Sequence, residues 1–233
     1  MTDAEAIDPK ITVFIAGDST ACDYEPSRAP RAGWGQMIGG FFDGNFISIE
    51  NRAISGRSSM SFINEGALDG ILADIKPGDY LLIQFGHNDA KKEDPARYSD
   101  PATYQSYLDQ YVKGARQAGA NPVLITPVHR RSFAKGRLVS THGLYPGAMT
   151  ALAKKEKAPL VDLTELSRVL FEALGEEKTK ELFLWLKPGV SVNYPEGVQD
   201  DTHFAENGAT EIAKLIVRGI KELNLPLAKY IRL

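Results

Sequence analysis

The chain has 233 residues, of which 43% are hydrophobic and 24% charged, as in ordinary globular proteins. Its net charge of -3 argues against a nucleic-acid or anionic-membrane partner, because both select for basic surfaces. No apolar run approaches the roughly 20 residues that span a bilayer, and the single cysteine, Cys22, cannot form an internal disulfide. The N-terminal segment MTDAEAIDPK lacks the apolar stretch of a secretory signal. We therefore expect a cytoplasmic protein.

Five apolar runs predict β-strands. They do not alternate polar with apolar residues, which indicates strands buried on both faces, as in parallel sheets. The runs are Ile11–Ala16, Phe46–Glu50, Tyr80–Phe85, Pro122–Val128 and a weaker one at Pro159–Leu163.

Helical patterns lie between and after these runs, where apolar residues recur at steps of three and four. One face consists of Tyr104, Tyr107, Leu108, Tyr111, Val112 and Ala115, and another of Ala209, Ile212, Ala213, Ile216, Val217, Ile220 and Leu223. Strands that alternate with helices predict an α/β fold with a mostly parallel sheet covered by helices on both sides. No repeat or linker interrupts the pattern, so we predict one domain over residues 1–233.

The connections that follow the strands are rich in small and polar residues. They read GDSTACD, NRAISGRSS, GHNDAKKED and TPVHRRSF. In open parallel sheets, ligands bind in the crevice outside the carboxyl ends of the strands. The segment 187–208 is longer than most connections, which predicts a functional loop before the last helix.

Ser19 follows the first predicted strand, where a serine is also an ordinary helix N-cap. A catalytic serine needs a base within hydrogen-bond reach, and the base needs a group that orients it. The sequence DDTHF offers both, because one chain turn brings Asp200 beside His203. Asp201 is the competing carboxylate, but it lies closer to His203 in sequence and reaches round the ring less easily.

Acyl transfer also needs donors for the oxyanion of a tetrahedral intermediate. The backbone N–H groups of Ser19 and Gly56 and the side-chain amide of Asn88 are the candidates, with a plain turn glycine and an Asx-turn as the alternatives. The Gly-x-Ser-x-Gly elbow of α/β-hydrolases is absent, because residue 21 is alanine. His87 and Asp89 flank Asn88, but no ligand spacing supports a metal, and no phosphate-binding motif predicts a cofactor.

Together these blocks resemble the SGNH (GDSL-type) hydrolase superfamily. GDST, the glycine of SGRS, the asparagine of GHND and the terminal Asp-x-x-His occur in the family's order. The resemblance implies a flavodoxin-like three-layer α/β/α sandwich with a central five-stranded sheet. It also implies Ser19 as nucleophile, His203 as base, Asp200 as its orienting partner, and an oxyanion hole from Ser19, Gly56 and Asn88.

A narrower likeness is to rhamnogalacturonan acetylesterases, through FIAGDSTA, NRAISGRSS, QFGHND and TPVHRR. It implies a carbohydrate esterase that removes acetyl groups from pectin oligosaccharides, without a cofactor. The alternatives are an acetylesterase for xylan or another glycan, a short-chain lipid esterase or thioesterase, and, more distantly, a non-catalytic carbohydrate-binding protein.

An acidic sugar substrate is consistent with the segment after the fourth strand. His129, Arg130 and Arg131 lie where they can face the crevice, and arginine suits a carboxylate. Solvated loop charges, or pairs with the acidic segment before the last helix, are the alternative. Trp34 is either a flat surface for a sugar ring or, as we favour, a core residue. The apolar C-terminal LPLAKYIRL can dock on its own domain or on a second copy, so a homo-oligomer is possible.

Overall fold

A five-stranded parallel sheet forms the centre of the protein, for which a computed structural model describes residues 10–232. The segment MTDAEAIDPK lies outside the described residues except for Lys10. The strand order is β3-β1-β4-β5-β8, the order of flavodoxin-like sheets. The strands are β1 (Ile11–Gly17), β3 (Ile47–Asn51), β4 (Tyr80–Gln84), β5 (Asn121–Ile125) and β8 (Leu160–Val161). All five predicted strands are confirmed, with ends shifted by up to three residues.

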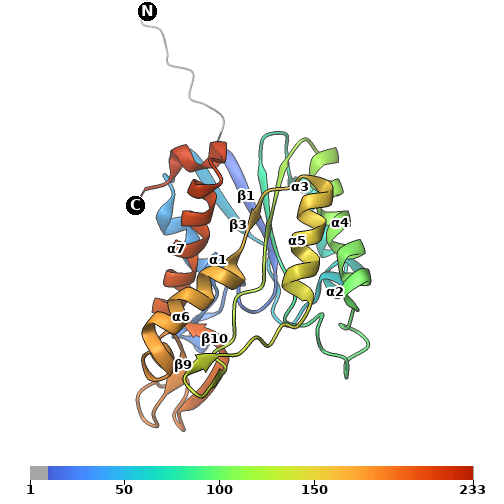
Figure 1. The fold of residues 1–233 in the computed structure, drawn as a ribbon. Coiled ribbons are helices and arrows are strands. Elements are labelled where there is room, and N and C mark those ends of the chain that lie inside the picture. The colour runs from blue at the N-terminus through green and yellow to red at the C-terminus, as the bar shows by residue number, and fades with distance from the viewer. Residues whose placement is uncertain (1–9, 233) are drawn as a thin grey trace, which may run out of the picture.

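Helices cover both faces of the sheet and make three layers (Figure 1). One layer contains α1 (Trp34–Met37), α6 (Leu163–Thr179) and α7 (Glu206–Glu222). The other contains α2 (Ser59–Asn64), α3 (Ala67–Asp74), α4 (Pro101–Gln117) and α5 (Tyr145–Glu156). The predicted apolar faces of α4 and α7 lie against the sheet, although Tyr107 is only half-buried and Leu223 is exposed.

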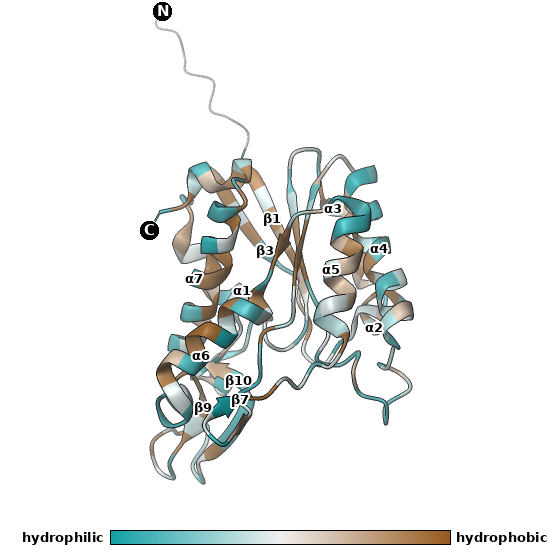
Figure 2. Cartoon of the chain, in the orientation of Figure 1, coloured by the Kyte–Doolittle hydropathy of each residue, from teal (hydrophilic) through white to brown (hydrophobic). Residues whose placement is uncertain are grey.

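Two hydrophobic cores explain why the strand sequences are continuously apolar. Val13 and Ile15 of β1 point into the core beneath α7, whereas Phe14 and Ala16 point into the core beneath α4. Figure 2 shows the apolar strands enclosed between helices whose outer faces are hydrophilic. Successive side chains of a strand point to opposite faces, so a strand covered on both sides needs apolar residues at every position.

Smaller elements surround one end of the sheet. A three-stranded antiparallel sheet has the order β2-β10-β9, and β6 pairs with β7. Their bounds are β2 (Arg31–Ala32), β6 (Phe133–Ala134), β7 (Arg137–Leu138), β9 (Phe183–Leu186) and β10 (Val198–Ala205). Short 3-10 helices are η1 (Pro26–Arg28), η2 (Ile38–Phe41), η3 (Lys180–Leu182) and η4 (Pro226–Tyr230).

The prediction of a long loop over 187–208 is wrong in part, because residues 198–205 form β10. This strand pairs with the nearby β9 on one side and with β2, which is distant in sequence, on the other. The C-terminal segment docks on its own chain: Leu227 is fully buried and Ile231 bridges to Phe42. Within residues 10–232, no helix has the length and apolar character that crossing a membrane requires.

Candidate active site

Ser19 lies in a tight turn directly after β1. A Cβ atom on Gly17 would lie 3.1 Å from the carbonyl oxygen of Gln84, so a side chain here would require the end of the strand to shift away from its neighbour. Asp18 then closes the turn, because its Oδ1 accepts from the backbone N–H and the hydroxyl of Thr20 at 2.9 and 2.8 Å. The residues after Ser19 form a turn and no helix, so Ser19 is not a helix N-cap. Its side chain is left for other partners.

His203 reaches this turn from the far end of the chain. Its Nε2 lies 2.9 Å from the Ser19 Oγ, across 184 residues of sequence, and its Nδ1 lies 2.7 Å from the Asp200 Oδ2. The pairing of β10 with β9 shifts register between Asp200 and Phe204. Such bulges re-aim side chains next to active sites, and this one brings the imidazole to the serine.

The Asp200 carboxylate fixes the protonation pattern of the imidazole. Its Oδ1 accepts from the backbone N–H groups of Thr202 and His203 at 2.8 and 2.9 Å. Burial alone would raise the pKa of Asp200, but the His203 ring and these N–H groups outweigh it and lower the pKa to about 2. The carboxylate is therefore ionised at neutral pH and accepts from Nδ1–H, which leaves Nε2 free to accept the Ser19 proton.

Asp201, the competing carboxylate, has different partners. Its Oδ1 accepts from the Arg131 Nη1 at 2.8 Å and from the Trp185 Nε1 at 2.9 Å. The Arg131 guanidinium also donates to the carbonyl oxygen of Glu176, and the side chain is only 7% exposed. The structure thus brings Asp200 to His203, while Asp201 ties β10 to the segment after β5.

The turns that carry Gly56 and Asn88 meet beside the Ser19 turn. Gly56 has a φ of +80°, a conformation that favours glycine. Ile54 donates its N–H to the carbonyl oxygen of Gly17 at 3.0 Å, which places the start of this turn against the end of β1. Asn88 is 3% exposed, and its Nδ2 donates to the Arg57 carbonyl oxygen at 2.9 Å. This bond uses one of the two amide N–H bonds of Asn88.

A buried pair that the sequence analysis did not identify joins two of these turns. The His87 Nδ1 donates to the Asp18 Oδ2 at 3.1 Å, and both side chains are at most 3% exposed. Burial alone would raise the pKa of Asp18, but His87 and Thr20 hold that pKa below its usual value. Burial lowers the pKa of His87 despite the nearby carboxylate. A neutral imidazole beside an ionised carboxylate therefore links the residue before Ser19 to the residue before Asn88.

The candidates for substrate contact after β5 lie in three different environments. His129 is 4% exposed and donates its backbone N–H to the Ser167 Oγ at 3.1 Å. Arg130 is half-buried, and its two terminal nitrogens donate to the His87 carbonyl oxygen and the Thr141 hydroxyl, each at 3.2 Å. Arg131 pairs with the acidic segment through Asp201, as the alternative interpretation held. Of the three, Arg130 hydrogen-bonds with the turn of Asn88, through the His87 carbonyl oxygen.

Trp34 is a core residue. Its side chain is fully buried, and its Nε1 donates to the Gln84 Oε1. The prediction that Trp34 offers a surface to a sugar ring is therefore wrong, because no face of the indole is accessible. Its position in the core follows the alternative that the sequence analysis favoured.

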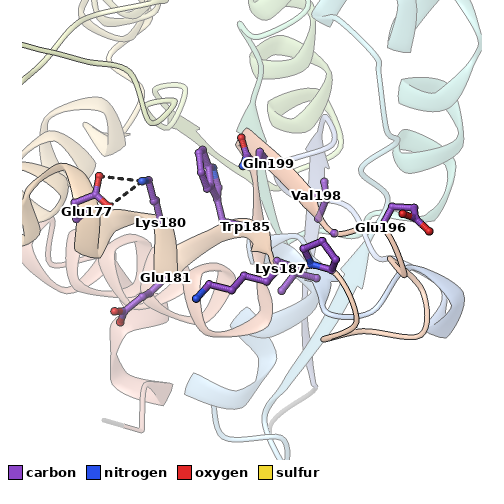
Figure 3. Close-up of a pocket in the computed structure, with 11 residues that line it drawn as sticks. Glu177, Lys180, Glu181, Trp185, Lys187, Glu196, Val198 and Gln199 are labelled. Carbon is purple, nitrogen blue, oxygen red and sulfur yellow. Dashed lines mark hydrogen bonds and ion pairs between the residues drawn. The ribbon is translucent and has the colours of Figure 1, made fainter.

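A hollow of about 700 Å³ lies between the end of α6 and the hairpin of β9 and β10 (Figure 3). Trp185 lines it, with the Lys180 ammonium 4.7 Å above the ring. Val198 and Gln199, which directly precede Asp200, complete one wall, but Ser19 and His203 do not line it. Within residues 10–232, no three histidine, cysteine or acidic side chains gather closely enough to hold a metal ion.

A serine hydroxyl bonded to a histidine that is in turn bonded to an aspartate is the arrangement of serine hydrolases. Comparison with family models matches residues 15–209 to the GDSL-like lipase/acylhydrolase family. The chain belongs to this family, which makes it a carboxylic ester hydrolase of the serine type and confirms the SGNH resemblance.

Two curated Bacillus subtilis proteins are similar over nearly the whole chain. Rhamnogalacturonan acetylesterase RhgT is 48% identical over 95% of this chain and 94% of its own. Probable rhamnogalacturonan acetylesterase YesY is 44% identical over 94% of this chain and 96% of its own.

Among solved structures, the Bacillus subtilis protein YxiM matches with a TM-score of 0.80 and 30% identity over 93% of this chain and 58% of its own. Axe2, an acetylxylan esterase from Geobacillus stearothermophilus, matches with a TM-score of 0.61 over 95% of this chain and 97% of its own. Its 17% identity supports the fold alone. The predicted three-layer fold is confirmed.

Proposed function

We propose that the protein is a carbohydrate acetylesterase that removes O-acetyl groups from rhamnogalacturonan, the pectin backbone, through an acyl-enzyme on Ser19. The observation that carries the chemistry is the pair of hydrogen bonds that joins Ser19, His203 and Asp200, which we call the relay. The His203 Nε2 lies 2.9 Å from the Ser19 Oγ, and the His203 Nδ1 lies 2.7 Å from the Asp200 Oδ2. The substrate class rests on two relatives of more than 40% identity that bear this activity in their names.

Acylation begins when the Ser19 Oγ attacks the carbonyl carbon of the acetyl ester. The His203 Nε2 accepts the hydroxyl proton as the new C–O bond forms, and Asp200 stabilises the resulting imidazolium. Collapse of the tetrahedral intermediate breaks the bond between the acetyl carbon and the sugar oxygen. His203 then delivers its proton to that oxygen, and the sugar hydroxyl leaves.

Deacylation repeats these steps with water as the nucleophile. His203 accepts a proton from the water as it attacks the acetyl carbon, and then returns a proton to the Ser19 Oγ as acetate leaves. Every proton is moved by groups of this chain.

The negative oxygen of both intermediates is bound by three donors in this proposal. They are the backbone N–H groups of Ser19 and Gly56 and the second amide N–H of Asn88. Two observations support it: the first N–H of Asn88 is held by Arg57, and the Gly56 turn lies against the end of β1. Loss of one such donor lowers turnover by about 100- to 1000-fold in other hydrolases.

Acetate release tests the function directly. The wild type is assayed on acetylated rhamnogalacturonan, acetylated xylan and a long-chain fatty acyl ester. We expect turnover on the first, and a loss of about 10⁶-fold in Ser19→Ala with an unchanged melting temperature. A Ser19→Ala variant as active as the wild type contradicts the mechanism. A preference for xylan or for the fatty acyl ester contradicts the substrate.

A further inference from the structure

Arg97 places a cation against the turn of Gly56, although the sequence gave no sign of it. It lies between β4 and α4, in the segment that follows Asn88. The nearest atom to a Cβ built on Gly56 is the Arg97 Nη1, at 3.6 Å, and the side chain is 40% exposed. The guanidinium therefore covers part of a turn that we assign to the oxyanion hole, and remains partly open to solvent.

Asp94 holds this guanidinium from one side. Its Oδ2 lies 3.0 Å from the Arg97 Nε, and its carbonyl oxygen accepts the Arg97 backbone N–H at 3.0 Å. This contact occupies Nε only. Within residues 10–232, no side chain or carbonyl group hydrogen-bonds with either terminal nitrogen of Arg97. The side chain is thus oriented by one partner while its outer pair of N–H donors stays available.

Three other arginines around the turns have more of their nitrogens hydrogen-bonded. Arg57 donates from Nε to Glu65 and from Nη1 to a carbonyl oxygen. Arg130 donates from both terminal nitrogens, and Arg131 donates from all three nitrogens. Arg97 shares with Arg31 the property that both terminal nitrogens lack a hydrogen-bond partner among residues 10–232, but the Arg31 guanidinium packs on the Tyr24 ring, 4.4 Å from its centroid, whereas that of Arg97 lies against the Gly56 turn.

Hydrogen bonds within the protein connect the turn that Arg97 covers to the turn of Ser19. The Tyr24 hydroxyl donates to the Ser19 carbonyl oxygen at 2.7 Å. The Ile54 N–H donates to the carbonyl oxygen of Gly17 at 3.0 Å. Since Ile54 lies two residues before Gly56, and Gly17 two residues before Ser19, this bond joins the Ser19 turn to the turn that Arg97 covers.

We infer that Arg97 forms an anion-binding subsite for the carboxylate of a uronic acid unit next to the acetylated sugar. This inference rests on the proposed function for the placing of the sugar chain, but its chemistry is that of the guanidinium. Two parallel N–H donors match the two oxygens of a carboxylate, and a fixed fork loses little entropy on binding. The subsite would let the enzyme select acidic over neutral acetylated sugars.

Binding of unacetylated oligogalacturonate, measured by calorimetry, tests the subsite without any reaction. The matched ligand is the same oligomer with its carboxyl groups reduced to alcohols. We expect the wild type to bind the acidic oligomer more tightly, and Arg97→Gln to weaken that binding about tenfold, the low end of the range for a bidentate hydrogen bond between charged groups. Arg97→Lys should retain part of the affinity. The control is Arg218→Gln, because Arg218 is similarly exposed and paired with an acid on the remote α7.

Kinetics provide a second readout on acetylated substrates. The ratio of kcat/KM for an acidic over a carboxyl-reduced acetylated oligomer should fall about tenfold in Arg97→Gln, through KM, and stay constant in Arg218→Gln. Equal binding of both oligomers by the wild type, or an unchanged affinity in a folded Arg97→Gln, overturns the inference. Absence of Ser19-dependent acetate release instead overturns the proposed function, so the two failures are distinguishable.

Discussion

Asp200→Asn removes one charge from the relay and preserves its shape. The Oδ1 position accepts two backbone N–H groups, so the asparagine would keep its carbonyl oxygen there and turn its NH₂ towards the His203 Nδ1. Two donors cannot share a hydrogen bond, so the imidazole would move its proton to Nε2. In that tautomer the ring cannot accept the proton of Ser19.

The expected loss in kcat is about 10⁴-fold, equivalent to about 5.5 kcal/mol of transition-state stabilisation. A chromogenic acetate ester and an acetylated oligosaccharide are both suitable substrates. Asp201→Asn is the matched control, because that side chain bonds with Arg131 and Trp185 and does not reach His203. We expect it to lower kcat/KM by less than tenfold.

Asp200 also affects stability at low pH. Its folded pKa of about 2 lies below the ordinary 3.8, so its contribution is present above pH 4 and is lost as the pH falls through 2. The side chain is 25% exposed, so solvent screening limits this contribution to about 1–2 kcal/mol. Acid unfolding should therefore show a shallower dependence on pH in Asp200→Asn.

If Asp200→Asn and Asp201→Asn lose activity equally, the relay is wrongly assigned.

Two further predictions concern buried carboxylates. Asp18→Asn should lower kcat about 10- to 100-fold with little change in KM, because the bond between Asp18 and His87 positions Ser19 relative to Asn88. A variant that loses stability but keeps the wild-type kcat would contradict this prediction. Burial raises the pKa of Asp89 to about 7 although Ser59 donates to it, so its contribution to stability is complete below pH 4 and is lost as the pH rises to 7. Between pH 4 and pH 7, the free energy of unfolding of Asp89→Asn, measured in urea, should rise relative to that of the wild type by about 1.4 kcal/mol per pH unit. Parallel stability profiles for the two proteins would refute the shifted titration.

The central sheet and the residues of the relay were predictable because each corresponds to a short pattern in the sequence. Strands covered on both faces must be apolar throughout, and parallel strands deliver their polar connections to one edge. Ser19, Gly56 and Asn88 therefore stand out directly after strands, and His203 follows Asp200 at a spacing that fits one turn.

The second sheet was not predictable in the same way. The run Phe183–Leu186 is only four residues long, and β10 consists mostly of polar residues. Its pairing with β2 joins residues more than 170 positions apart, which no local pattern records. Because polar and apolar residues do not alternate in β10, its sequence does not predict a strand.

Side-chain environments that depend on tertiary packing also could not be predicted from the sequence. Trp34 is buried by packing and by Gln84, and Arg131 is enclosed by partners from two distant segments. Arg97 lies in the segment DAKKEDPAR, which contains many charged residues of both signs, so its sequence alone does not distinguish a binding residue from a solvated surface charge. Two statements stay predictions: that residues 1–233 form one domain, and that the protein acts in the cytoplasm. The oligomeric state stays open, with a homo-oligomer as one possibility.

Trapping of the acyl-enzyme tests the central claim most directly. The protein is mixed with a chromogenic acetate ester, quenched in acid within milliseconds, digested and examined by mass spectrometry. We predict an added acetyl group on the peptide that contains Ser19, which chases to free acetate on longer incubation and does not form in His203→Ala. Rapid acetate release with no acetyl group ever found on Ser19, or with the group on another residue, would contradict the account.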